Sequence, residues 1–250
     1  MTGADPKRVE LQPAYVLHHR PYRDTSRILE LFTRDHGRVT VFAHGARGGR
    51  NKSASLISVL QPFNRLLVSW AGRGEAGQLT GAEFDGGFSI MPPEQLVSGF
   101  YLNELLLKLF ARHDGQAEVF ALYAMTLDDL KAATDPMRSL RIFEKRLLDA
   151  LGYGLVLDTE VGTQAPVDAQ FMYHYRLEQG VVRALDLAEG RLVFSGSSLL
   201  SIANEDLTTA TALVDARRLL RAAIDQVLDG RELKSRQVLH ALRRSQSTPT

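Results

Sequence analysis

The stretch Gly37-Arg-Val-Thr-Val-Phe-Ala-His44 carries the clearest structural signal in this chain. Val39, Val41 and Ala43 occupy one set of alternate positions, and the other set holds Arg38, Thr40, Phe42 and His44. Successive side chains of a β-strand point to opposite faces of the sheet. The alternation therefore predicts a strand whose valines lie in a core while its other face carries a cation, a ring and polar groups.

Segments of similar composition lie on both sides of this stretch, separated by Gly, Arg-Asp or Ser-rich connections. They are rich in β-branched and aromatic residues, and the predicted strands are 13–20, 25–33, 37–45, 58–70 and 77–84. Five short strands in about 75 residues, with a long Gly/Ser connection at 45–58, predict a small Greek-key barrel of the OB type. In the fourth segment, Trp70 is expected inside the barrel, whereas Phe63 shares a face with Arg65.

Beyond Ile90 the apolar residues recur at helical spacing. Pro92 and Pro93 precede a predicted helix over 94–110, two more helices are predicted near 117–133 and 137–151, and a final one spans 212–228. Residues 171–176, 181–187 and 191–194 have the pattern of a short β-meander. The sequence thus predicts an α+β protein, with a five-stranded barrel over 1–85 and a mainly helical domain over 86–250 that includes a meander at about 171–194.

Positive charge is concentrated near the N-terminus, although the whole chain has a formal net charge of only +1. Residues 36–74 hold six basic residues and no acidic one. Because phosphates attract Arg and Lys while rings stack on unpaired bases, this pattern predicts a nucleic-acid-binding face. The candidate phosphate contacts are Arg20, Arg23, Arg38, Arg47, Arg50, Lys52, Arg65 and Arg73, with Phe42 and Phe63 as stacking residues. The alternatives are a solvated basic loop and, for Arg20 and Arg23, the bracing of a turn around Pro21-Tyr22.

Motifs for catalysis or cofactor binding are not found in the sequence. The chain has no cysteine, which removes thiolate nucleophiles and cysteine-ligated metals. Residues 72–77 match G-x-G-x-x-G, but a strand-like segment follows in place of a helix, so they predict a hairpin turn. We predict no catalytic residue, no metal and no cofactor. Without an apolar run of about 18 residues, we expect a cytoplasmic protein that does not enter the membrane.

An ordered set of short segments resembles the RecO family of recombinational DNA-repair proteins. In the first part these are Tyr15-Val-Leu-His-His-Arg-Pro-Tyr22, Gly37-Arg-Val39, Gly45-Ala-Arg47, Leu60-Gln-Pro-Phe63 and Gly72-Arg-Gly-Glu75. In the second part they are Tyr101-Leu-Asn-Glu-Leu-Leu106, Leu151-Gly-Tyr-Gly154 and Leu233-Lys-Ser-Arg236. The resemblance covers nearly the whole chain and implies an OB-fold followed by a helical domain.

The resemblance also implies a function. Family members bind single- and double-stranded DNA, anneal complementary strands, engage the acidic tail of single-stranded-DNA-binding protein, and with RecR help to load RecA. Many relatives carry a four-cysteine zinc knuckle where this chain has Asp158, Thr159 and Val161–Ala165, so a zinc site is not expected here. Without the resemblance, an RNA-binding OB protein or a nucleotide-using repair enzyme stays open, although the enzyme has no supporting motif.

Two further basic segments are candidate binding regions. Arg138, Arg141 and Lys145 recur along one face of the predicted helix 137–151, which suits the acidic tail of the partner protein. The alternative is a solvated face on which Glu144 and Asp149 pair with these cations. Residues 216–244 hold eight basic and three acidic residues, and they are the candidate second DNA contact during annealing.

Overall fold

The computed structural model describes residues 7–23, 26–44, 58–72, 76–87, 89–184 and 192–246, without the side chains of Lys7, His240 and 242–246. The chain forms two compact units. Unit 1 comprises residues 1–134 and 233–250, and unit 2 comprises residues 135–232. No helix in the described ranges combines the length and the apolar character needed to cross a bilayer.

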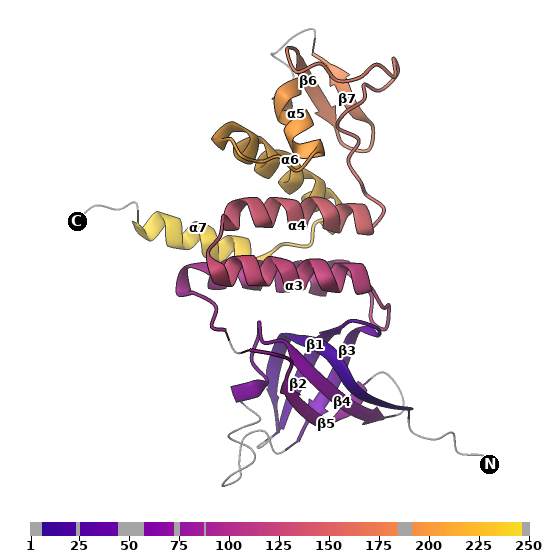
Figure 1. Cartoon of the computed structure of the whole chain (residues 1–250), viewed down its shortest axis with the longest axis vertical. Helices are drawn as coiled ribbons and strands as arrows, with labels where there is room; N and C mark the ends of the chain where they lie inside the picture. The colour runs from indigo at the N-terminus through magenta and orange to yellow at the C-terminus, as the bar shows by residue number, and fades with distance from the viewer. Residues whose placement is uncertain are drawn as a thin grey trace, which may run out of the picture. The chain divides into compact units, whose positions relative to one another are not determined.

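The N-terminal part of unit 1 is a closed five-stranded barrel (Figure 1). Its strands are β1 (Lys7–Tyr22), β2 (Ser26–Thr33), β3 (Gly37–Ala43), β4 (Leu66–Gly72) and β5 (Ala76–Phe84). They pair in the order β1-β2-β3-β5-β4, and β4 also pairs with β1. All pairs are antiparallel except β3 with β5. This arrangement confirms the predicted OB-type barrel.

The alternation in β3 places its apolar residues as the sequence indicated. Val39 and Val41 lie in the barrel core with Leu29 and Leu31 of β2, and Trp70 of β4 packs inside as predicted, with 8% of its surface exposed. The expected strand over 58–70 is too long, because Ser58 and Val59 are helical and Phe63 adopts a positive φ of 70°. The hairpin predicted at 72–77 is confirmed by the antiparallel pairing of β4 with β5.

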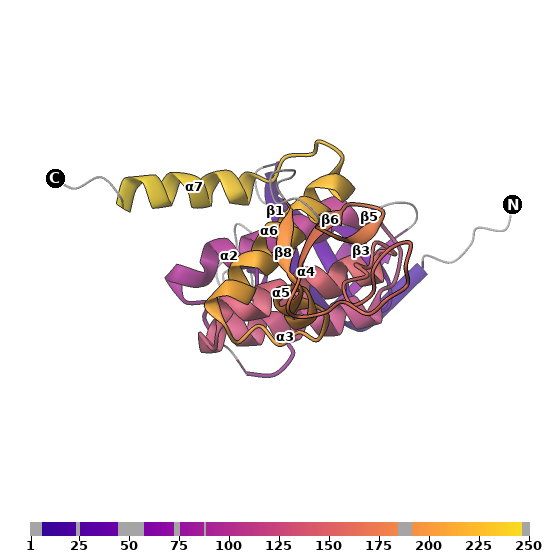
Figure 2. The ribbon, with the colours of Figure 1, turned by 90° about the horizontal axis from the view of Figure 1, so that it is seen from above.

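The rest of unit 1 is helical: a short 3₁₀ turn η1 (Pro93–Gln95), α2 (Leu96–Leu109), α3 (Ala117–Ala132) and α7 (Lys234–Gln246). Tyr15 and Phe32 on the outside of the barrel pack their rings against Phe120 and Tyr123 of α3. Helix α2 contacts β1 and α7, and these elements can be followed in Figure 2.

A chain of buried hydrogen bonds joins α2 to both the barrel and α3. The Asn103 side-chain amide donates to the Leu17 carbonyl oxygen at 2.9 Å, and the Tyr123 hydroxyl donates to Asn103 Oδ1. Leu17 lies at the bulge where the pairing of β1 with β2 shifts between Val16 and His18. Because buried polar groups are costly to leave unpaired, this chain holds α2 in one position against β1.

Unit 2 is formed by α4 (Pro136–Ala150), β6 (Met172–Arg176), β7 (Gly180–Arg183), β8 (Val193–Ser195), α5 (Gly196–Ala203) and α6 (Ala210–Leu228). The small antiparallel sheet was expected, but its connectivity differs from a meander. Its order is β7-β6-β8, so β8 returns to the free edge of β6 and does not pair with β7. Helices α5 and α7 were not predicted from the sequence. The helix predicted near 137–151 corresponds to α4, and Gly152 follows it with a φ of +80°, the left-handed conformation that glycine adopts readily after a helix.

Candidate nucleic-acid interface

The outer face of β1, β2 and β3 is built from rows of side chains that lie side by side across the strands. The pairing of β1 with β2 and of β2 with β3 sets residues of the three strands side by side, and a new row on the same face begins every second residue. Going toward the end of β1, the successive rows are His18–Glu30–Thr40, Arg20–Ile28–Phe42 and Tyr22–Ser26, with His44 hydrogen-bonded to Ser26. These residues face away from the core cluster of the barrel.

Three rings come together at the end of this face. The Phe42 ring lies 5.3 Å from the Tyr22 ring and 6.4 Å from the His44 ring, nearly parallel to the latter at 10°. Ser26 Oγ is 2.9 Å from His44 Nδ1, which orients the imidazole. Phe42 and Tyr22 are half-buried and His44 is exposed, so the rings are supported by the sheet and accessible to a ligand. We call Tyr22, Phe42, His44, Arg20 and Arg23 the aromatic face.

The cations of the aromatic face come from the end of β1. Arg20 and Arg23 are both exposed. The Arg23 guanidinium carbon lies 5.2 Å from the centre of the Tyr22 ring, a distance that favours cation–π attraction. Arg23 has a φ of +52° in the turn that follows β1. The two arginines therefore sit beside the rings, at the connection from β1 to β2.

A neighbouring histidine adds no charge to this surface at neutral pH. Burial, with a smaller effect of the Arg27 charge, holds the pKa of His19 below its ordinary value of 6.5. His19 is therefore neutral under physiological conditions. The positive charge of Arg20 and Arg23 is therefore not increased by His19 at neutral pH.

This arrangement can bind single-stranded nucleic acid. Every base has a π-face that stacks on an aromatic side chain, and arginines beside the rings neutralise the phosphates. In OB-folds the face of strands 2 and 3 and the loop between strands 1 and 2 are the surfaces that bind oligonucleotides. The aromatic face occupies that position on this barrel.

Arg38 does not belong to the exposed cations, which corrects the sequence prediction. Its guanidinium donates to the carbonyl oxygens of Leu107 at 2.6 Å and Phe110 at 2.7 Å, at the end of α2. It also lies 3.5 Å from Glu30, and only 12% of its side chain is exposed. Burial lowers the pKa of Arg38, and the attraction of Glu30 partly offsets this effect. Arg38 therefore joins the barrel to α2.

The prediction that Phe63 stacks on bases is also wrong. Phe63 is only 5% exposed, and its ring packs against the exposed ring of Phe100 at 5.0 Å. The close approach of Phe63 to α2 requires a glycine, because a Cβ on Gly99 would lie 2.8 Å from the Phe63 ring. Phe63 is out of phase with the core residues Leu66 and Val68 of the same segment, yet its side chain is buried beneath α2.

The remaining predicted contacts fall into two groups. Arg65 is half-exposed and forms an ion pair with Asp85 at 2.7 Å, so its charge is largely compensated. Arg47, Arg50, Lys52 and Arg73 lie outside the described residues. The structure thus brings together Arg20, Arg23 and Phe42 from the sequence prediction.

Tyr22 and His44 were not among the predicted site residues. Each stands two residues along its strand from a residue that was predicted, Tyr22 after Arg20 and His44 after Phe42. The period of two that placed Phe42 on the outer face would have placed them there too. The sequence does not give the register of the strands, which places Arg20 of β1 and Phe42 of β3 on either side of Ile28 of β2.

The cationic stripe predicted on α4 is largely compensated within unit 2. Arg141 is 7% exposed and pairs with Glu144 at 2.9 Å. Lys145 lies 3.5 Å from both Asp149 and Glu205, and Arg138 donates to the Glu205 carbonyl oxygen. The expectation of an exposed stripe is therefore wrong for Arg141, and the alternative of pairing along the helix describes Arg141 and Lys145 better.

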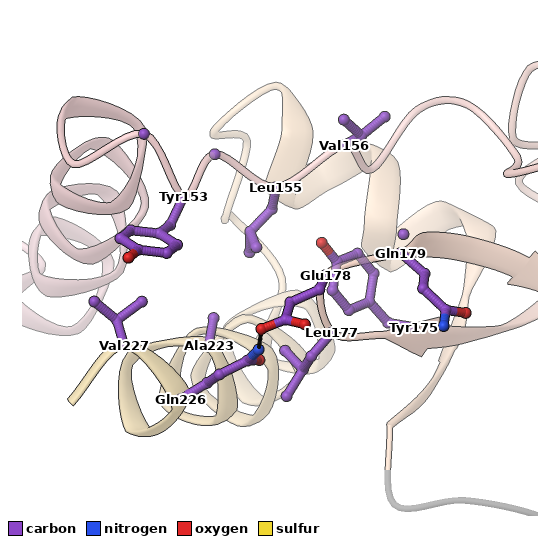
Figure 3. Close-up of a pocket in the computed structure, with 13 residues that line it drawn as sticks. Tyr153, Leu155, Val156, Tyr175, Leu177, Glu178, Gln179, Ala223, Gln226 and Val227 are labelled. Atoms are coloured by element: carbon purple, nitrogen blue, oxygen red, sulfur yellow. Dashed lines mark hydrogen bonds between the residues drawn. The ribbon is translucent and has the colours of Figure 1, made fainter. Parts of the chain in front are cut away.

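Unit 2 contains a hollow of about 310 Å³ beside the Gly152–Val156 segment. Figure 3 shows Tyr153 and Tyr175 on opposite sides of it, with Glu178 and Gln226 hydrogen-bonded between them. Burial raises the pKa of Tyr175 to about 12, so its phenol is neutral. The lining contains no nucleophile paired with a base. Among the described residues, no group of three or more His, Cys, Asp or Glu side chains could hold a metal ion.

The closed barrel with an exposed ring-and-arginine face, followed in the chain by helices, defines an OB-fold protein, a class in which many members bind nucleic acids. Comparison with known families agrees. The family model "Recombination protein O N terminal" matches residues 9–88, and "Recombination protein O C terminal" matches residues 93–237. The chain belongs to the RecO family of DNA repair proteins.

Individual relatives are similar along almost their entire length. The DNA repair protein RecO of Nitrosococcus oceani is 45% identical over 237 residues, which cover 95% of each chain. That of Methylococcus capsulatus is 44% identical over 237 residues, covering 95% of this chain and 96% of the relative. That of Alkalilimnicola ehrlichii is 44% identical over 246 residues, covering 97% and 96%.

Proposed function

We propose that this chain is a recombination mediator that binds single-stranded DNA on the aromatic face of its barrel. The observation that carries the proposal is the convergence of Tyr22, Phe42 and His44 with Arg20 and Arg23 at one end of β1–β3. The aromatic rings stack on unpaired bases, and the arginines pair with the phosphates of the same strand. Family membership favours DNA as the polymer.

The distribution of charge between the two units supports this placement. Unit 1 holds 19 Lys and Arg against 14 Asp and Glu, whereas unit 2 holds 11 against 15. The barrel unit is thus +5 and the other unit −4, counting histidine as neutral. A polyanion is attracted to unit 1 and repelled by unit 2. We therefore place the DNA on unit 1.

Annealing follows from the same chemistry. Two strands repel each other through their phosphates. Arginines bound to the phosphates neutralise this charge and release counterions, which lowers the repulsion. Of residues 216–244, the predicted second DNA contact, only 233–244 belong to unit 1, and this part contains four basic residues and no acidic one. We propose that double-stranded DNA or a second strand is held there, and that no covalent bond is broken.

The proposed protein partners rest on family membership. We propose that the chain engages the acidic tail of single-stranded-DNA-binding protein and acts with RecR to promote RecA loading. Because Arg141 is buried and paired, the α4 stripe does not support a site for the tail. Arg138 and Lys145 stay candidates, and substituting them tests that remaining part of the prediction.

The test is fluorescence anisotropy with a labelled oligonucleotide of about 20 nucleotides, a length that exceeds one OB-fold site. Replacing both Tyr22 and Phe42 by Ala should weaken binding by at least tenfold, because each stacked base contributes about 1–3 kcal/mol. Phe84→Ala is the matched control, since Phe84 is an exposed ring on β5, 38% accessible. Equal affinities of the double variant and the control would overturn the proposed face.

The same assay separates the alternatives. Tighter binding of RNA than of DNA would favour an RNA-binding protein, and an absolute dependence on ATP would favour a nucleotide-using enzyme. We expect strand annealing to proceed undiminished in EDTA and without nucleotide, because charge neutralisation needs neither. A stoichiometric zinc content in the chelator-washed protein would contradict this expectation.

A further inference from the structure

Unit 1 contains a second surface feature next to the aromatic face, a hollow of about 330 Å³ between the bulge of β1, helix α2 and the start of α7. We call it the α2/α7 pocket. Its wall is mainly apolar and includes Leu17, Val97, Phe100, Leu107 and Val238, with Lys234 at the start of α7. The volume lies near the lower end of the range for small-molecule sites, about 300–1,000 Å³. It suits one planar group.

Phe100 is the prominent side chain of this pocket. Its ring is 46% exposed, and behind it the buried Phe63 ring makes an edge contact at 5.0 Å and 63°. Gly99 makes room for Phe63. Phe100 is therefore a ring that is fixed from behind and accessible from the front, which is the arrangement that base stacking requires.

Three polar side chains of the wall, those of Asn103, Glu104 and Ser235, are hydrogen-bonded within the protein. Glu104 accepts hydrogen bonds from the Lys234 and Ser235 backbone N–H groups at 2.9 Å and from Ser235 Oγ at 2.7 Å. Asn103 is bonded to Leu17 and Tyr123. The pocket thus offers apolar and aromatic contact within the wall, while the exposed Lys234 contributes the positive charge at its border.

The pocket is continuous with the aromatic face. His18 lines the pocket and also belongs to the row of the outer face that precedes Arg20 and Phe42. A strand stacked on Tyr22 and Phe42 and running along β1 toward its bulge arrives at this opening. His18 and Phe100 line the same pocket, so the residue that ends the outer face on this side also borders the Phe100 ring.

We propose that the α2/α7 pocket receives one unpaired base of the DNA strand that crosses the aromatic face. The base stacks on Phe100, and Lys234 pairs with an adjoining phosphate. This inference rests on the proposed function and extends it to a second base site on the helices. Continuity with the aromatic face and the absence of acidic residues from 233–250 favour a nucleotide over an apolar peptide as the occupant.

The experiment combines photocrosslinking with affinity measurements. Oligothymidylate that carries 5-iododeoxyuridine at single positions is bound to the full-length protein, irradiated and digested. We expect crosslinked peptides that contain Phe100 for some positions and Tyr22 or Phe42 for others. Phe100→Ala should weaken binding of a strand of about 20 nucleotides by roughly five- to tenfold, as expected for one stacked base, and leave a strand too short to reach both sites unchanged.

The control variant is Leu96→Ala, since Leu96 is an exposed residue of the same helix, 37% accessible, that does not line the pocket. Phe100→Trp should bind the strand of about 20 nucleotides with wild-type affinity, because tryptophan also stacks on a base. This result would show that Phe100→Ala weakens binding through lost stacking and not through a change in the fold. If Phe100→Ala binds DNA like wild type and no crosslink reaches it, this inference fails while the aromatic face stands. If the Tyr22 and Phe42 substitutions also have no effect, the proposed function fails. Weakened binding of an acidic peptide, with DNA binding unchanged, would mark a peptide site and overturn the inference.

Discussion

Arg38→Met tests whether this arginine stabilises the fold or binds DNA. Methionine keeps much of the aliphatic length of the side chain and removes the guanidinium, which donates to the carbonyl oxygens of Leu107 and Phe110. Hydrogen bonds from a charged group contribute about 1.5–3 kcal/mol each, and water can partly replace the donor at a helix end. We expect a loss of about 3 kcal/mol in the free energy of unfolding, measured by urea denaturation.

The loss should not come from an unpaired carboxylate. Glu30, the ion-pair partner of Arg38, keeps Arg112 at 2.7 Å and the Thr40 hydroxyl at 2.8 Å. The loss in the free energy of unfolding therefore comes from the hydrogen bonds between Arg38 of the barrel and the end of α2. In DNA-binding titrations under native conditions, the dependence of log affinity on log salt should stay unchanged.

Arg20→Met is the matched control because Arg20 is exposed on the same outer face. It should change stability by less than about 0.5 kcal/mol and reduce the salt slope by about 0.7, the value for one single-strand phosphate contact. Wild-type stability of Arg38→Met together with a lower salt slope would show that Arg38 contacts DNA. That result would return Arg38 to the DNA-binding residues.

Three further predictions test the basic segment that contains Arg47, Arg50 and Lys52, the attachment of α7 to α2, and the packing of α3 on the barrel. Replacing Arg47, Arg50 and Lys52 together by Glu should reduce the salt slope of DNA binding by about two, and an unchanged slope would remove this segment from the interface. Burial raises the pKa of Glu104, but hydrogen bonds from Ser235 and Lys234 outweigh it and hold the pKa below 4.5. Stability should therefore fall as the pH drops below about 4.5, and urea titrations of Glu104→Gln should give a flatter pH dependence. Phe32→Ala, at a ring with no exposed surface, should lower the free energy of unfolding by about 3–5 kcal/mol in urea melts; a loss below about 1 kcal/mol would contradict the packing of α3 on the barrel.

Most of the helices and strands, and the sidedness of the strands, could be predicted from the sequence, whereas α5 and α7 could not. Alternation in Gly37–His44 placed Val39 and Val41 in the core and Phe42 outside. The spacing of apolar residues located α2, α3, α4 and α6. These features depend on residues within a few positions of one another, because strand and helix periods are local properties of the backbone.

The tertiary structure alone decided which cations and rings face a ligand. Arg38 and Arg20 look alike in the sequence, yet Arg38 binds the carbonyl oxygen of Leu107, 69 residues away. Phe63 is buried because Gly99 admits it beneath α2. Helix α7 reaches unit 1 through Glu104, 130 residues from Lys234. Such pairs depend on how distant segments meet in space, and no local period encodes that meeting.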